Sequence, residues 1–518
     1  MRSLIKFPAL ALALALCSCS ACPPFRLIHD DDGDSNWDYR HLTVGKIDSA
    51  VATLAGTGVT SYAICTGSDY VHYGSQYADS TFLKGSGLKE RGVDFIRTVL
   101  VSAREHGMEP IVTYRMNDLH FTSLTDESAR ADFFLSKWWH EHPEFWVNED
   151  FGWHTVGAYD FAHKEVRDHK VAMMTEQIDM YGDVMDVYLM DFLRFFCYFK
   201  QGQGRSHTAE MTDMVRRMRC VTDSLSKVKG HRIMLAARVA PVNDNNLDQG
   251  LDVRQWLKEG LVDFLSLGIH CILDGQTPVD AFRQEMGKDL NVPVYASGCD
   301  IMYDYADEEE ISDGMIRAWC SNVFARGADG LQSFNYYGYY GKWRNNAPSP
   351  VSGTVVNRSF YPEMYGELTS PEKLEGRNKI FWLSEGQREY GLIPNTPLPL
   401  EIAPGEEAEA VIFVGDKMKK AHPEEVIFFY RTGAGVPLEV TLNGQVALRE
   451  EPTYNAIYDR NTRLREGQCQ RAVVFPSGAV RHGDNVLKFK SAADAAPVTL
   501  VRTELALKYG PVEQCGYF

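Results

Sequence analysis

Short apolar segments alternate with longer amphipathic segments from residue 25 to about residue 334, and this alternation constrains the fold more than any other feature. Eight strand–helix units in succession are typical of a closed parallel barrel. A doubly wound open sheet is the alternative, but it rarely needs eight units in one run. We expect strands at 27–28, 61–65, 110–114, 184–190, 233–237, 264–269, 292–296 and 330–334, and helices at 47–56, 93–106, 165–181, 210–228, 253–260, 279–287 and 309–326.

The pattern changes after a proline-rich stretch at 392–404. Beyond it, short segments with strand-like alternation follow one another, and Asn443-Gly444 is a sequence that favours a type I′ hairpin turn. The predicted fold class is therefore α/β, a (β/α)8 TIM barrel followed by a C-terminal antiparallel β-sandwich. We place the barrel at 24–370, a linker at 371–405 and the sandwich, which we expect to brace the barrel, at 406–518.

The N-terminus carries a secretion signal. Arg2 and Lys6 precede an apolar run at 7–16 that is too short to span a bilayer. The sequence Leu-Cys-Ser-Cys at 16–19 resembles a bacterial lipobox, so we expect residues 1–19 to be a lipoprotein signal peptide and Cys19 to be lipidated. The predicted location is the bacterial cell envelope, at the outer membrane or in the periplasm, with a lipid anchor in the membrane. A simple cleaved signal peptide is the alternative.

Charge and cysteine content exclude several classes of function. The formal net charge of −17 disfavours nucleic-acid binding, because the chain and the phosphates would repel each other. The cysteines are scattered without a C-x-x-C pair, which argues against a structural zinc site and a dense disulfide framework. The 25 tyrosines and 9 tryptophans give modest support to sugar binding, since such rings stack on sugars but also fill cores.

A long stretch from 117 to 163 interrupts the rhythm after the third expected strand. It is rich in Trp and His. Connections of this length are usually functional, and this one would lie over the C-terminal face of the barrel. It is either a cleft wall or lid, or a small packed subdomain, and both descriptions can hold together.

Barrel enzymes place their chemistry at the C-terminal ends of the strands. This rule selects polar residues that follow almost every expected strand, and we expect them to contact a carbohydrate substrate. The candidates are His29, Asp30, Asp31, Asp32, Arg115, Asn117, Asp118, Asp191, Arg194, Arg238, His270, Asp274, Asp300, Asn335 and Tyr336.

Asp191 is the most informative of these residues, because it directly follows an apolar strand. A buried charge costs free energy unless it is paired, and Arg194 is the partner that the sequence offers. An ion-paired carboxylate at a barrel mouth suits a glycosidase nucleophile or a stabiliser of an oxocarbenium-like transition state. The alternative is an Asp–Arg pair that only fixes the loop.

Two segments around Asp191 carry a family resemblance. Residues 160–167 read D-F-A-H-K-E-V-R, and the strand ending at Asp191 is followed by Phe192, Leu193 and Arg194. This resembles the glycosyl hydrolase-like 10 group, barrel proteins distantly similar to α-amylases, with Asp191 on the second Asp of that group's strand motif. The sequence departs from the motif at residues 185–187, which read Met-Asp-Val near the place where the motif has Asp-Gly-Ile. Over residues 24–340 the resemblance implies a barrel and glycoside chemistry, without a proven acid/base pair.

Ordinary glycoside hydrolysis requires a second carboxyl group. No Glu follows the fourth, fifth or seventh strand. Asp300 is slightly favoured as the second carboxyl, and Asp274 is the other candidate; either can instead cap a loop. His270 can polarise or protonate a leaving group, since an ordinary histidine titrates near neutral pH.

The run of Asp30, Asp31, Asp32 and Asp34 has two interpretations. Its oxygens can bind sugar hydroxyls, which we favour, or a Ca²⁺ ion; no other cofactor is expected. Three hypotheses result: a glycoside hydrolase acting on a polysaccharide or oligosaccharide, a non-catalytic glycan-binding lipoprotein of the cell surface, and a metal-assisted enzyme that uses this acidic run.

Overall fold

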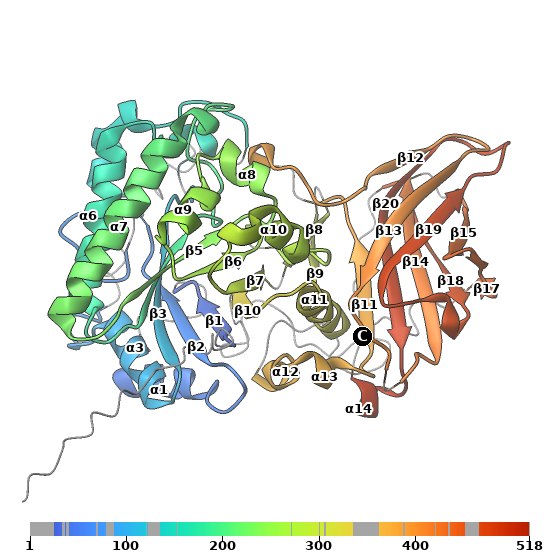
Figure 1. The fold of residues 1–518 in the computed structure, drawn as a ribbon, viewed down its shortest axis with the longest axis horizontal. Coiled ribbons are helices and arrows are strands. Elements are labelled where there is room, and N and C mark those ends of the chain that lie inside the picture. The colour runs from blue at the N-terminus through green and yellow to red at the C-terminus, as the bar shows by residue number, and fades with distance from the viewer. Residues whose placement is uncertain are drawn as a thin grey trace, which may run out of the picture.

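The fold is taken from a computed structural model of the whole chain. It describes residues 25–33, 37, 41–68, 71–78, 87–120, 122, 135–152, 154–270, 272–299, 301–304, 307–334, 362–386, 389–419, 421–433, 436–450, 466–516 and 518. Its two parts are a parallel barrel and a pair of antiparallel sheets, which lie side by side (Figure 1).

Eight parallel strands close into a barrel, as the alternation predicts. Around the barrel, each barrel strand pairs with the barrel strand that follows it in the sequence, and the last pairs with the first. The strands are β1 (Leu27–Asp31), β2 (Ser61–Cys65), β3 (Glu109–Arg115), β4 (Val187–Asp191), β5 (Met234–Val239), β6 (Phe264–Leu267), β7 (Val294–Cys299) and β10 (Gly330–Phe334).

Helices cover the outside of the barrel and lie close to the predicted positions. They are α1 (Val44–Ala52), α3 (Phe95–Glu105), α6 (Lys164–Tyr181), α7 (Thr208–Lys229), α9 (Val253–Glu259), α10 (Val279–Met286) and α11 (Asp313–Ala325), with the short α8 (Asn243–Asp248) after β5. Two starts differ by three residues or more from the prediction: α1 begins at Val44 and not at 47, and α11 begins at Asp313 and not at 309. α11 begins at Asp313 because the Ser312 side chain caps it by accepting from Met315 N–H. Before it, β8 (Ile301–Asp304) pairs antiparallel with β9 (Asp307–Glu310).

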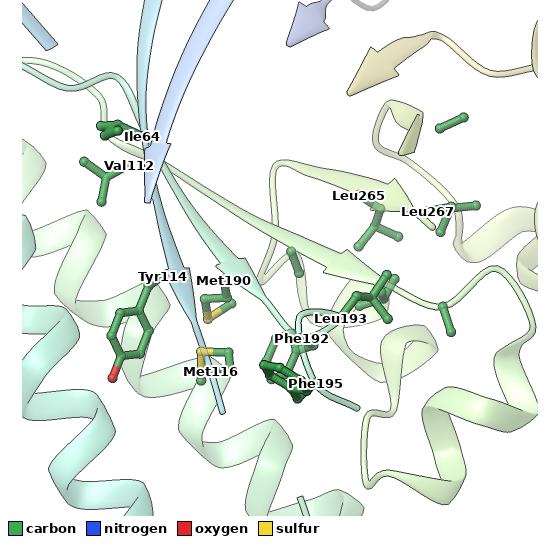
Figure 2. Packing of buried hydrophobic residues seen from close by; sticks show 14 of the residues in the cluster. Ile64, Val112, Tyr114, Met116, Met190, Phe192, Leu193, Phe195, Leu265 and Leu267 are labelled. Carbon is green, nitrogen blue, oxygen red and sulfur yellow. The ribbon is translucent and has the colours of Figure 1, made fainter. Parts of the chain in front are cut away.

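The strands are buried on both faces, and alternate residues serve two separate cores. In β4, Val187 and Leu189 point into the barrel interior, where eight buried side chains from seven of the strands meet. Tyr188 and Met190 belong to the larger cluster between strands and helices. Figure 2 shows Met190 in this cluster, near Tyr114 of β3. The alternation decides which polar residues at the strand ends face the interior.

The stretch from 117 to 163 forms a packed unit within its described part. It holds α5 (Lys137–Glu141) and two short turns of 3-10 helix. The Trp139 ring stacks on Trp146 at 4.1 Å between centroids, and Trp138 stacks on His169 of α6 at 4.0 Å. Trp139 Nε1 donates to the carbonyl of Gly157 at 2.8 Å. These contacts support the packed-subdomain interpretation for these aromatic residues.

Two antiparallel sheets form the C-terminal sandwich, with a hydrophobic core between them. The predicted Asn443-Gly444 turn joins β15 to β16, and both residues have positive φ, as a type I′ turn requires. One sheet contains β11 (Lys379–Leu383), β12 (Leu400–Ile402), β14 (Glu425–Gly433), β17 (Arg449–Glu450), β18 (Gln468–Phe475) and β20 (Val498–Lys508); the other contains β13 (Glu407–Val414), β15 (Glu439–Leu442), β16 (Gln445–Val446) and β19 (Gly483–Lys490).

The residues expected as a linker, 371–405, contain α13 (Pro371–Leu374) and the strands β11 and β12, both paired with β20. β11 lies beside α11 (Figure 1). Its Ile380 and Trp382 side chains belong to the same buried cluster as the barrel helices. The remaining short helices are α12 (Pro362–Glu367) and α14 (Val512–Cys515). Within the described residues, no helix combines the length and apolar character needed to cross a membrane.

Candidate functional site

A polar layer closes the C-terminal end of the barrel interior. Four of its five members lie two residues beyond an inward-facing apolar residue of their own strand, so the period of two directs them inward as well, and Gln332 lies two residues beyond Gly330. The layer brings together side chains from five strands, all of them buried. They are Asp30 of β1, Asp191 of β4, Arg238 of β5, Ser297 of β7 and Gln332 of β10.

Asp191 and Arg238 form an ion pair at the centre of this layer. They are register partners on the adjacent strands β4 and β5. Arg238 Nη1 lies 3.2 Å from each carboxylate oxygen of Asp191, and the Leu193 backbone N–H donates to Oδ1 at 2.8 Å. The side chains of Asp191 and Arg238 are 4% and 0% exposed, so water screens the pair very little. The prediction that Arg194 pairs with Asp191 is therefore wrong: the partner comes from the next strand and not from the next turn of chain.

The guanidinium of Arg238 is held on every side. Its Nε donates to Ser297 Oγ at 2.8 Å, and its Nη2 donates to the backbone carbonyl of His270. The Phe334 ring packs against it, with 5.7 Å from Cζ to the ring centroid. A planar cation with these fixed contacts holds the Asp191 carboxylate in one orientation.

Asp30 supplies a second carboxyl group to the same end of the barrel. Gln332 Nε2 donates to its Oδ2 at 2.6 Å, and Thr113 Oγ1 lies 3.4 Å from its Oδ1. Burial raises the pKa of Asp30 to about 7, and the nearby charge of Asp191 acts in the same direction, while Arg238 opposes it. The barrel thus contains one carboxyl in an ion pair and another that keeps its proton to near neutral pH.

Arg194 lies at the centre of a neighbouring group that spans three loops. Its Nη2 lies 3.1 Å from His120 Nε2 and its Nη1 lies 3.2 Å from His270 Nε2. Because a guanidinium only donates, both Nε2 atoms act as acceptors in these contacts. Burial and the charges of Arg194 and Arg238 hold the pKa of His270 well below its usual range. His270 is a neutral acceptor here.

Asp118 anchors the other side of this group. Its Oδ2 accepts from Arg115 Nη1 at 2.9 Å, and its Oδ1 accepts from His120 Nδ1 at 2.6 Å. Burial acts to raise the pKa of Asp118, but His120, Arg115 and Arg194 together hold it below its usual range. The predicted residues Arg115, Asp118, Arg194 and His270 are therefore brought together.

Other predicted residues point away from this layer. His29 faces α12, where its Nδ1 lies 2.9 Å from the Tyr365 hydroxyl, and burial lowers its pKa to about 3. Asp31 accepts from Tyr62, Trp37 and the Gly33 backbone, and so fixes the loop after β1. Because side chains alternate along a strand, Asp30 faces inward while His29 and Asp31 face the surrounding helices. Asp32 is buried as well.

Asn117 and Asp274 have local structural partners. Asn117 Nδ2 donates to the carbonyls of Tyr159 and Cys197, which ties three loops together. Asp274 accepts from the Gln276 backbone N–H at 2.9 Å in the loop after β6, and the charge that acts on it is that of Arg326, not of Asp191. It lines a hollow beside the C-terminal sandwich.

Several predicted residues lie outside the described residues: Cys19, Asp34, Asp300, Asn335 and Tyr336. In the part of the chain that the structure describes, no group of three or more His, Cys, Asp or Glu side chains is placed to hold a metal ion. Of the acidic run, Asp31 already accepts three hydrogen bonds from protein groups.

Sequence reasoning missed Gln332, Ser297 and Thr113, which contact Asp30 and Arg238. Thr113 and Gln332 lie inside their predicted strands rather than after them, and β7 extends past its predicted end to include Ser297. The signal that could have found Gln332 is its place in the middle of Gly-Leu-Gln-Ser-Phe, where an amide has to find a partner inside the barrel.

Comparisons with known proteins give distant structural similarity alone. No family model and no curated protein sequence matches the chain. Solved structures of glycoside hydrolase barrels are similar, among them one described as "Glycoside hydrolase", with 11% identity, a TM-score of 0.38 and coverage of 91% of this chain and 94% of that one. An α-L-fucosidase from Paenibacillus thiaminolyticus has 13% identity, a TM-score of 0.35 and coverage of 90% and 96%.

A cycloisomaltooligosaccharide glucanotransferase from Paenibacillus sp., solved with cycloisomaltoheptaose, has 10% identity and a TM-score of 0.34. The similarity covers 93% of this chain but only 57% of the glucanotransferase. Identities and TM-scores this low carry no inference about activity.

Proposed function

We propose that the protein is a glycoside hydrolase that acts on a polysaccharide or oligosaccharide at the C-terminal end of the barrel. The observation that carries this proposal is that two carboxyl groups in different environments lie at the same end of the barrel. Asp191 forms an ion pair with Arg238, whereas the pKa of Asp30 is raised to about 7. Cleavage of a glycosidic bond needs one carboxylate and one carboxylic acid.

Each carboxyl has a role in the proposed reaction. The Asp30 carboxylic acid donates its proton to the glycosidic oxygen as the bond from that oxygen to the anomeric carbon breaks. The Asp191 carboxylate stabilises the positive charge that develops on the anomeric carbon and the ring oxygen. A water molecule then supplies the hydroxyl of the new sugar end, and its released proton restores the acid.

Asp30 is a better acid than the candidates named from the sequence. His270 accepts a hydrogen bond at Nε2 and its pKa is held well below the usual range, so it has no proton to donate at that atom. Asp274 contacts Gln276 and lines a different hollow. Asp300 lies outside the described residues.

Product release by purified protein tests the proposal. We expect the wild type to release reducing sugar from at least one member of a panel of plant, algal and host glycans. The Asp191→Asn variant should bind the same glycan and release none. Asp183→Asn is the matched control, because Asp183 is a half-exposed aspartate paired with Arg97 far from the barrel mouth. Glycan binding without turnover by the wild type would instead favour a non-catalytic glycan-binding protein.

We also propose that Cys19 carries a lipid that anchors the protein in the bacterial cell envelope. The lipobox-like sequence at 16–19 supports this. Metabolic labelling with a fatty acid should mark the wild type but not Cys19→Ser; equal labelling of both would rule out that cysteine.

A further inference from the structure

A hollow lies between the barrel and the C-terminal sandwich, next to the candidate site but separate from it. Its barrel side is formed by five residues that follow β6, and its other side by residues 382–384, Gly386 and 394–396. The five are Ile269, Ile272, Leu273, Asp274 and Gln276. We call this space the junction hollow.

The junction hollow contains one carboxyl oxygen whose hydrogen-bonding capacity is unused. Asp274 Oδ1 accepts from the Gln276 backbone, whereas Oδ2 is buried and has no hydrogen-bond partner among the described residues. Burial raises the pKa of this carboxyl to about 6. The charge that acts on it comes from Arg326, whose own guanidinium pairs with Asp280 at 3.0 Å. A buried acceptor without a donor is costly, and a ligand hydroxyl would remove that cost.

The walls of the junction hollow are fixed by hydrogen bonds across the two parts of the chain. Asn395 Nδ2 donates to the Gln276 carbonyl at 2.9 Å, and Gln276 Oε1 accepts from Phe413 N–H at 3.0 Å. A Cβ on Gly275 would lie 2.7 Å from the Trp382 ring, so only glycine admits the indole at this distance. The hollow is therefore built before any ligand arrives.

The same loop connects the junction hollow to the Asp191 site. Ile269 and Ile272 pair across a tight turn and both line the hollow. His270 lies between them with φ of 39°, and its carbonyl accepts from Arg238 while its ring accepts from Arg194. One face of this turn contacts the arginines of the candidate site, and the other faces the junction hollow.

We propose that the junction hollow binds one sugar unit of the glycan, away from the bond that is cleaved. A sugar hydroxyl donates to Asp274 Oδ2, and the C–H face of the ring packs on the apolar wall that includes Leu273 and Trp382. A sugar suits this lining because it offers hydroxyl donors on its rim and an apolar face. The identity of the ligand rests on the proposed function, and the C-terminal sandwich then helps to bind the substrate as well as bracing the barrel.

Two variants and a control test the subsite. Asp274→Asn keeps the acceptor for Gln276 but replaces the second oxygen with a donor. Ser384→Phe fills the junction hollow from the sandwich side and covers the case in which the first variant folds poorly. Asp213→Asn is the control, since Asp213 is exposed on α7, pairs with Arg216 and does not line the hollow. Calorimetry measures oligosaccharide binding, and hydrolysis is measured on an oligosaccharide and on an aryl monosaccharide.

We expect both variants to bind the oligosaccharide about tenfold more weakly than the wild type and the control, in line with the loss of one hydrogen bond to a charged group. Turnover of the aryl monosaccharide should stay unchanged, because it does not reach the junction hollow. Equal binding by all four proteins would overturn the subsite, as would an equal loss on both substrates. Binding is measured directly and does not depend on hydrolysis. A wild type that binds the oligosaccharide but does not hydrolyse it would therefore refute the proposed function, while the binding of the variants would still decide whether the subsite exists.

Discussion

Arg238 contacts both oxygens of Asp191 from the adjacent strand, at 3.2 Å each, and the two residues are register partners on β5 and β4. The pair is almost fully enclosed, so removing one partner leaves the other as a buried charge without compensation. The proposed chemistry depends on this pair, because it fixes where the Asp191 carboxylate lies.

Replacing Arg238 with Met should lower the free energy of unfolding by about 3–5 kcal/mol, the usual cost of breaking a buried ion pair on one side. Urea unfolding measures it. Arg97→Met is the matched control, since the Arg97–Asp183 pair is exposed at the surface, and we expect a loss below about 1 kcal/mol. Equal losses in the two variants would contradict the importance assigned to Asp191–Arg238.

The Asp30 carboxyl should make the folded state less stable as the pH rises. Its folded pKa of about 7 lies above the value of 3.8 for an ordinary Asp, so between these pH values the folded state binds more protons than the unfolded state, and stability falls as the pH increases. We expect Asp30→Asn to gain stability relative to the wild type from pH 4 to pH 7.

The buried His29 acts in the opposite direction, because its folded pKa of about 3 lies below the ordinary value of 6.5. The wild type and the Asp30→Asn variant both contain His29. The difference between their free energies of unfolding in urea therefore reports on Asp30 alone. A difference that stays constant from pH 4 to pH 8 would show that Asp30 ionises in the folded state as it does in the unfolded one.

Removing the charge of Arg194 should raise the pKa of His270. Burial is the largest cause of the lowered pKa of His270, and the charge of Arg194 is the next. In Arg194→Gln the pKa of His270 should therefore rise but stay below 6.5. An NMR titration of ¹³C-labelled histidine measures the change. Arg216→Gln is the control, because Arg216 pairs with Glu259 on the protein surface. A His270 signal that titrates identically in the wild type and Arg194→Gln would contradict the contact.

The barrel should not fold stably without the C-terminal strands. Every residue of α11 from Asp313 to Val323 is buried, and Ile380 and Trp382 of β11 belong to the same cluster as this helix. A chain that ends at residue 370 would expose that apolar surface. We expect it to be insoluble or to lack a cooperative unfolding transition, whereas a soluble, cooperatively folded fragment would contradict the shared core.

Much of the fold could be predicted from the sequence, because apolar periodicity reports directly on burial. All eight barrel strands and the seven predicted helices lie near their predicted positions. The site was harder to predict. The strand-end rule selects both Asp191 and Arg238, but their pairing depends on the register between β4 and β5. Arg194 is a neighbour of Asp191 along the chain, and nearness along the chain does not report that register.

The acidic run that begins at Asp30 is a second case in which the sequence does not predict the contacts. A shift of one residue turns a strand side chain to the opposite face, so only Asp30 enters the barrel while His29 and Asp31 face outward. Its partner Gln332 is 302 residues away in the sequence, and only the closure of β10 on β1 brings the two together. Long-range contacts of this kind leave no local pattern.

The most direct test of the proposed chemistry uses two aryl glycosides of the sugar that the enzyme cleaves, one with phenol and one with dinitrophenol as the leaving group. Dinitrophenolate departs without a proton, so Asp30→Asn should retain most activity on that substrate but lose about 10²–10⁴-fold on the phenyl glycoside, the usual contribution of a general acid. Asp191→Asn should lose activity on both. Equal effects of Asp30→Asn on the two substrates, or an active Asp191→Asn variant, would contradict the account.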